Sequence, residues 1–159
     1  MQRVLIIGVG NEVRGDDAIG LLAARDLASL KLPWVRVEES RGDGARLLSL
    51  WRGVEAVLII DAVSSGSPPG TLHRVDVTTF PIPGSFRCAS SHDFGVVEAI
   101  ETARALGELP GECVLYGVEV GETTVGHPSF VYADVRHALL RAIRAELSGW
   151  NPSLSVEPT

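Results

Sequence analysis

The sequence predicts an α/β protein, a three-layer sandwich in which helices flank a twisted, mostly parallel mixed sheet of about five strands. Short runs such as RVLIIGV and VEAVLIIDA are apolar nearly throughout, which is typical of strands buried on both faces of a parallel sheet. Between these runs, apolar residues recur at helical spacing. Strands that alternate with helices in this way predict a layered α/β domain.

In the first half of the chain, the expected helices separate three expected strands. Four apolar residues recur at helical spacing before Pro33, which closes the first helical segment. The expected elements are a strand over 3–9, a helix over 17–30, a strand over 34–39, a helix over 44–51 and a strand over 54–62.

The second half begins with a turn-rich loop, SSGSPPG, followed by a strand in which apolar and polar residues alternate. Such alternation predicts an edge strand over 71–77, antiparallel to the others. Prolines make the segment 80–86 irregular. A single domain over 1–150 is expected, with a flexible tail over 151–159. The remaining elements expected are a helix over 92–106, a strand over 113–120 and a helix over 131–147.

Length, charge and cysteine content limit the class of protein. The chain has 159 residues, enough for one domain with its own core. A net charge of −6 argues against a nucleic-acid partner. Cys88 and Cys113 do not form a C-x-x-C pair, so we expect reduced, buried thiols in a cytoplasmic protein. No secretory signal or membrane-spanning run is visible, and we expect a monomer without membrane insertion.

The segment GVGNEVRGDDAIG, from Gly8 to Gly20, joins the first expected strand to the first expected helix. A dinucleotide-binding loop requires the pattern G-x-G-x-x-G, and Val13 stands where the third glycine belongs. Two adjacent carboxylates would also repel a pyrophosphate. Asp16 and Asp17 instead suit the N-terminus of a helix, as capping residues, or a metal site, as oxygen ligands. The residues alone leave both interpretations open.

Two further polar side chains are expected near this loop. Asp61 ends an apolar strand, and His92 lies in SSHDFG at the start of a predicted helix. Because the carboxyl ends of parallel strands share one edge of a sheet, Asp17, Asp61 and His92 are expected at one rim. Two carboxylates and an imidazole from separate elements can bind a divalent metal ion there. Taken singly, Asp61 also suits a turn cap, and His92 suits a capping or surface position.

The other histidines carry weaker signals. His73 lies on the expected edge strand and is predicted to be solvated, His127 lies in a loop, and His137 lies on a helix near arginines. No G-x-S-x-G turn is present, and neither cysteine is beside a histidine in the sequence. A serine or cysteine nucleophile therefore has no support from the sequence.

These residues and their spacing give the sequence a resemblance to the hydrogenase maturation proteases, endopeptidases that act on the large subunit of nickel–iron hydrogenases. The resemblance rests on the segments GVGNEVRGDDAIG, LIIDAVSSGSPPG, SSHDFGVVEAI and LYGVEV. It implies a twisted sheet sandwiched by helices. It also implies that Asp17, Asp61 and His92 are the catalytic, metal-binding residues and that Asn11 and Glu39 bind substrate.

The substrate proposed for this family is a large-subunit precursor that already holds nickel. The resemblance implies that the peptidase recognises this nickel, which the precursor carries, and then removes a C-terminal extension. Asp17 is shorter than the glutamate more common in the family, and ESRGDG replaces the usual turn after the second strand, with Glu39 as the nearest acidic match. The alternatives are a related metallopeptidase with another protein substrate, a nucleotide-binding module, and a nickel chaperone without peptidase activity.

Overall fold

The computed structural model describes residues 3–11, 18–89, 94–120 and 132–150. The described residues form six strands and four helices. In chain order these elements are β1 (Val4–Val9), α1 (Ile19–Ala28), β2 (Val35–Ser40), α2 (Gly44–Leu50), β3 (Ala56–Ser64), β4 (Leu72–Asp76), β5 (Arg87–Cys88), α3 (Val96–Leu106), β6 (Glu112–Glu119) and α4 (Tyr132–Trp150).

The strands form one mixed sheet with the order β2-β1-β3-β6-β4. The first four strands in this order are parallel neighbours, whereas β4 runs antiparallel to β6 at the edge. The short strand β5 pairs with the end of β3 through Val63 and Ser64. The predicted fold class is therefore confirmed, including the antiparallel edge strand expected over 71–77.

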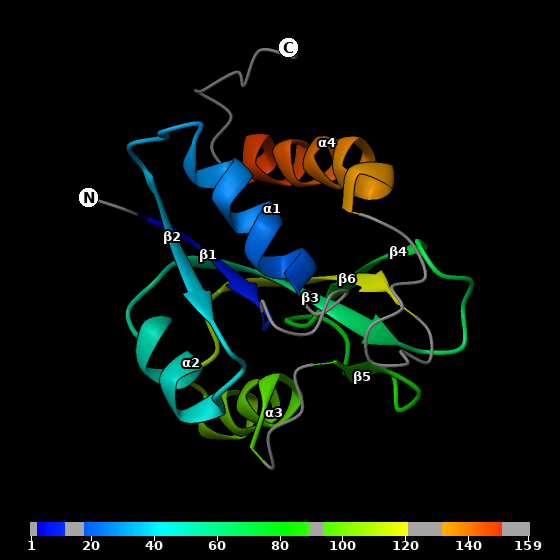
Figure 1. Cartoon of the computed structure of the whole chain (residues 1–159). Helices are drawn as coiled ribbons and strands as arrows, with labels where there is room; N and C mark the ends of the chain where they lie inside the picture. The colour runs from blue at the N-terminus through cyan, green and yellow to red at the C-terminus, as the bar shows by residue number, and fades with distance from the viewer. Residues whose placement is uncertain (1–2, 12–17, 90–93, 121–131, 151–159) are drawn as a thin grey trace.

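Each face of the sheet buries its own hydrophobic cluster. Leu58 and Ile60 of β3 pack in a cluster that includes residues of α1 and α4, whereas Val57 and Ile59 pack in a cluster with residues of α2 and α3. Figure 1 shows α1 and α4 on one side of the sheet and α2 and α3 on the other. Because successive residues of a strand face opposite ways, burial on both faces requires the continuous apolar run seen in the sequence.

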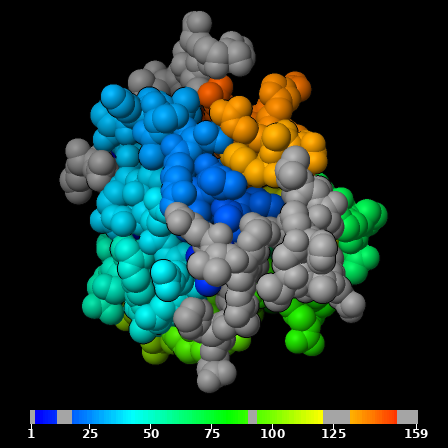
Figure 2. Space-filling model, in the orientation of Figure 1, coloured from blue at the N-terminus to red at the C-terminus, as the bar shows by residue number. Residues whose placement is uncertain are grey.

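Helices α1 and α4 are joined by polar contacts at the surface of their shared layer. Figure 2 shows the blue atoms of α1 beside the orange atoms of the first part of α4. Asp26 of α1 accepts hydrogen bonds from the Tyr132 hydroxyl at 2.7 Å and from Arg136 Nε at 2.8 Å. The Arg136 guanidinium holds the pKa of Asp26 below its ordinary value, with the Tyr132 hydroxyl adding to the effect.

The predicted and observed elements differ at a few places. The sequence did not predict β5, because two residues are too short to show a period. The helix expected from His92 is observed as α3, which begins at Val96. The N–H of Gly95, the residue before α3, donates to the Glu98 carboxylate at 3.0 Å. The tail expected over 151–159 lies outside the described residues. Among the helices that the structure describes, none has the length and apolarity needed to cross a bilayer.

Candidate active site

The strand order places a topological switch point at the carboxyl ends of β1 and β3. From the carboxyl end of β1 the chain runs through α1 to β2, which lies on one side of β1 in the sheet. From the carboxyl end of β3 the chain runs to β4, which lies toward the opposite edge. The two connections therefore diverge between β1 and β3. In open α/β sheets, ligands bind at such a topological switch point.

Two glycines of the opening segment bring α1 close to this switch point. A Cβ atom on Gly8 would overlap the Gly20 carbonyl oxygen, and a Cβ on Gly20 would overlap the carbonyl oxygens of Val9 and Ile60. These glycines therefore allow the first turn of α1 to lie directly on the ends of β1 and β3. The helix packing that a dinucleotide loop assigns to its third glycine is supplied here by Gly20, twelve residues after Gly8.

Asp61 is a completely buried carboxylate on β3, with 0% of its surface exposed. The last residue of β3 that pairs with β1 is Ile60, so Asp61 is the first β3 residue beyond this pairing. The thiol of Cys88 in β5 lies beside Asp61. Burial, together with the neighbouring Asp61 carboxylate, raises the pKa of Cys88 well above its ordinary value. Cys88 is therefore a neutral thiol at physiological pH.

The other two predicted metal ligands, Asp17 and His92, lie outside the described residues. Two described residues close to them in the sequence lie at the same end of the sheet as Asp61. Gly20, three positions after Asp17, packs against the Ile60 carbonyl, and Cys88, four positions before His92, contacts Asp61. Within the described part of the chain, no three His, Cys, Asp or Glu side chains gather as a metal site. The three-ligand cluster stays a prediction.

The two predicted substrate-binding residues, Asn11 and Glu39, belong to the ends of β1 and β2. Asn11 follows Gly10, whose N–H donates to the Ser40 carbonyl at 3.0 Å, and it is half-buried. Glu39 accepts a hydrogen bond from Arg25 of α1 at 2.8 Å and is partly exposed. Both residues therefore lie toward the predicted rim, and their role in binding substrate stays a prediction.

Sequence reasoning missed a second buried carboxylate near this rim. Glu119, at the end of β6, is 0% exposed and accepts hydrogen bonds from the Ser65 N–H at 2.8 Å and the Ser65 hydroxyl at 2.7 Å. Its other partner is His73 Nε2, at 3.1 Å. The prediction that His73 is solvated was wrong, since its side chain is only 18% exposed. An acidic residue in the apolar run CVLYGVEV was the available signal, because such a residue needs a buried partner.

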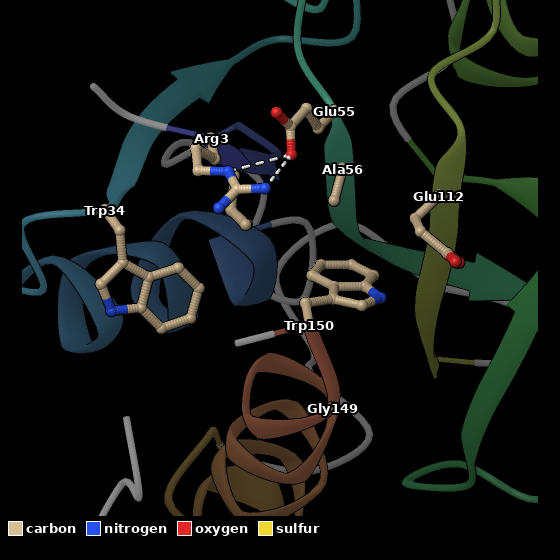
Figure 3. A pocket seen from close by; sticks show the side chains of 8 residues that line it. Arg3, Trp34, Glu55, Ala56, Glu112, Gly149 and Trp150 are labelled. Carbon is tan, nitrogen blue, oxygen red and sulfur yellow. Dashed lines mark hydrogen bonds and ion pairs between the residues drawn. The ribbon is translucent and has the colours of Figure 1, made fainter. Parts of the chain in front are cut away.

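The opposite end of the sheet holds a cavity of about 210 Å³. Trp34 and Trp150 contribute indole rings to its walls, and Arg3 and Glu55 form an ion pair beside it, as Figure 3 shows. These residues adjoin the amino ends of β1, β2 and β3 and the last turn of α4. The cavity is therefore distant from the switch point, and the chemistry of the candidate active site does not involve it.

Comparisons with known proteins agree with this arrangement. A family model described as hydrogenase maturation protease matches residues 35–145. The hydrogenase expression/formation protein HupD of Rhodobacter capsulatus is 30% identical over 154 residues, which cover 94% of this chain and 73% of that protein. The hydrogenase 2 maturation protease of Escherichia coli is 29% identical over 149 residues, which cover 90% of each chain.

A solved structure extends the comparison to three dimensions. The solution structure of an endopeptidase from Escherichia coli superposes with a TM-score of 0.77 at 26% identity, over 94% of each chain. Fold, family model and relatives agree along most of the described chain. This chain therefore belongs to the hydrogenase maturation protease family and is a peptidase.

Proposed function

We propose that this peptidase removes a C-terminal extension from the nickel-loaded large-subunit precursor of a nickel–iron hydrogenase. The observation that carries the proposal is Asp61, a fully buried carboxylate at the topological switch point of the sheet. Burying a charged carboxylate costs free energy unless hydrogen bonds or a bound ion compensate for the lost solvation. The position of Asp61 is also where open α/β sheets bind their ligands. The substrate class is supported by the family match and by the name of the Escherichia coli relative, a hydrogenase 2 maturation protease.

In this proposal, Asp17, Asp61 and His92 contact the nickel that the precursor carries. Carboxylate oxygens and an imidazole nitrogen suit a borderline divalent ion. Three protein ligands would leave coordination positions for the precursor's own ligands, so nickel can bridge the two proteins. Nickel is then part of the substrate and acts as a tag that identifies a loaded precursor. Asn11 and Glu39, from the ends of β1 and β2, contact the precursor around this point.

Hydrolysis adds one water molecule across one peptide bond. The water oxygen bonds to the acyl carbon, its proton passes to a base, and the departing amine gains a proton. A carboxylate at the rim is the available base. Ser65 lies 3.4 Å from His73 Nε2, but its hydroxyl donates to Glu119, and Cys88 lies beside Asp61. The reaction takes place in the cytoplasm on a folded precursor, with one copy of the peptidase.

The decisive experiment compares purified nickel-loaded and nickel-free precursor as substrates. The intact mass of the large subunit is measured before and after incubation with the peptidase. We expect loss of a C-terminal fragment from the loaded precursor only. Equal cleavage of the two precursors would show that the peptidase does not recognise nickel. If neither precursor is cleaved, large-subunit precursors are excluded as the substrate.

A further inference from the structure

Glu119 is the other fully buried acid of the described chain, and the proposed chemistry does not use it. Burial disfavours its charge, but the Ser65 backbone N–H, the Ser65 hydroxyl and His73 outweigh that effect and lower the pKa of Glu119. Its backbone is also tied down, because its N–H donates to the Thr71 carbonyl and its carbonyl accepts from the Gly70 N–H. Glu119 therefore connects the end of β6 to both ends of the β3–β4 connection.

The arrangement of Ser65, His73 and Glu119 is not that of a nucleophilic triad. In a triad, the serine and the acid contact different ring nitrogens of the histidine. Here Ser65 Oγ, at 3.4 Å, and the Glu119 carboxylate, at 3.1 Å, lie beside the same Nε2 atom. The Ser65 hydroxyl is also only 2.7 Å from Glu119, to which it donates. We call these three residues the Glu119 clamp, since their contacts join three segments of the chain.

The clamp is linked to Asp61 through the register of the sheet. Asp61 pairs with Gly117, which pairs with His73, so Asp61 and His73 point to the same face about 10 Å apart at their Cα atoms. Gly117 has no side chain, and a Cβ there would lie 2.8 Å from Val63 and 3.3 Å from Phe86. Val63 and Phe86 therefore fill the space between Asp61 and His73.

Phe86 and β5 complete the link. The His73 and Phe86 rings pack edge to face, with centroids 4.9 Å apart. Phe86 immediately precedes β5, in which Cys88 pairs with Val63 and lies beside the Asp61 carboxylate. The clamp thus supports Phe86, Phe86 leads directly into β5, and β5 contacts Asp61. The chain reaches His92 four residues after Cys88.

We propose that His73 and Glu119 are positioning residues, which hold β5 against β3 so that Asp61 and the segment leading to His92 keep their relative placement. This inference rests on the proposed function for its effect on catalysis. Among the described residues, the contact between Cys88 and Asp61 connects the Glu119 clamp, through Phe86 and β5, to the candidate active site. Loss of the clamp loosens β5 and lowers kcat/KM for the nickel-loaded precursor, because Asp61 and His92 contact its nickel in the proposed function.

Three variants test this role. His73→Leu removes the contact to Glu119, His73→Gln retains a side-chain N–H donor for it, and Arg74→Leu is the matched control on the next residue of β4. Arg74 points to the other face, where it pairs with Glu146 at 2.6 Å. We expect His73→Leu to lower kcat/KM by about tenfold or more. We expect His73→Gln to recover most of kcat/KM and Arg74→Leu to keep it.

A second readout does not depend on peptidase activity. The rate at which N-ethylmaleimide modifies Cys88 is measured by peptide mass spectrometry in the folded full-length variants. We expect His73→Leu to speed this reaction about tenfold, with His73→Gln and Arg74→Leu near wild type. Cys113 serves as the internal control, because it is fully buried and burial raises its pKa to about 12.

The outcomes separate the two ideas. If the wild type cleaves the nickel-loaded precursor but a folded His73→Leu variant keeps both its kcat/KM and its Cys88 reactivity, the positioning role is wrong and the proposed function stands. If the wild type does not cleave the precursor, the proposed function fails, and the Cys88 rate alone decides whether the clamp holds β5. If His73→Leu does not fold, Ser65→Ala is used instead in both measurements, because it removes one hydroxyl from the clamp.

Discussion

At the carboxyl end of the sheet, Asp61 and Glu119 are completely buried, whereas at the amino end the side chains of Arg3 and Glu55 are 63% and 62% exposed. An exposed ion pair contributes little and costs little, because water solvates both charges. A buried carboxylate persists only where hydrogen bonds or a bound ion compensate for lost solvation. The comparison shows that the fold buries carboxylates, which is costly, at the carboxyl end of the sheet. This is the end at which we place the chemistry.

The glycines at the two ends differ in the same way. Gly8 and Gly20 have no space for a Cβ atom, because the backbone of α1 lies against the ends of β1 and β3. At the amino end, Gly149 has no atom within 4 Å of the position that a Cβ would take. Close backbone approach is therefore required beside the candidate active site and not beside the cavity at the other end.

The largest effect is expected from Gly8→Ala. The new methyl group would meet the Gly20 backbone and Ala24, which cannot move aside as a flexible side chain would. We expect a loss of about 3 kcal/mol or more in the free energy of unfolding, measured by urea denaturation. The matched change at the other end, Gly149→Ala, is expected to stabilise helix α4 by up to about 1 kcal/mol. Equal effects of the two changes would remove the contrast between the two ends.

A large loss of activity is expected from Asp61→Asn. The amide keeps the size of the side chain but removes the charge that meets nickel in the proposed function. We expect the rate of precursor processing to fall by about 100-fold or more, while circular dichroism shows a folded chain. Glu55→Gln is the matched control, because Glu55 lies just before the amino end of the same strand. Processing by that control is expected within about twofold of wild type, and normal processing by folded Asp61→Asn would exclude Asp61 from the site.

A pH-dependent effect is expected from Glu119→Gln. The folded-state pKa of Glu119 is lowered below its ordinary value of 4.5, so its charge stabilises the fold above that pH. This stabilisation is lost as the pH falls through the folded-state pKa. We expect wild type to exceed the variant in free energy of unfolding near pH 7, with a difference that shrinks below about pH 4.5. Urea titrations from pH 3 to 7 measure this difference, and a constant difference would contradict the assignment.

The smallest effect is expected from Arg3→Gln at the amino end. The Arg3 and Glu55 side chains are joined at 2.9 Å but are mostly exposed, so water and salt screen their attraction. We expect a change of about 0.5 kcal/mol or less in the free energy of unfolding. A double-mutant cycle with Glu55→Gln isolates the pair. A coupling energy above about 1 kcal/mol would show that the amino end also depends on a charged contact.

Much of the fold was predictable because its signals are local. The apolar runs of β1 and β3 and the helical spacing before Pro33 appear directly in the sequence, and so does the alternation of β4. The candidate site was predictable only in part. The place of Asp61 on a buried strand followed from the pattern, but the expectation that Asp61 ends this strand was wrong, because β3 continues to Ser64 by pairing with β6 and β5. The sequence also did not predict the contact between Asp61 and Cys88, because β5 is two residues long. Asp17 and His92 remain predictions.

The sequence by itself determined the layered α/β fold, the order of its main elements and the location of Asp61 on a buried strand. These properties depend on periodicity and on the limited conformations of glycine and proline, which act over a few residues. The tertiary structure alone decided that Gly20 packs on Ile60, that His73 is half-buried and that Glu119 joins Ser65 to His73. Such contacts join residues up to 54 positions apart, as for Ser65 and Glu119, and depend on strand order and register, which no local pattern specifies.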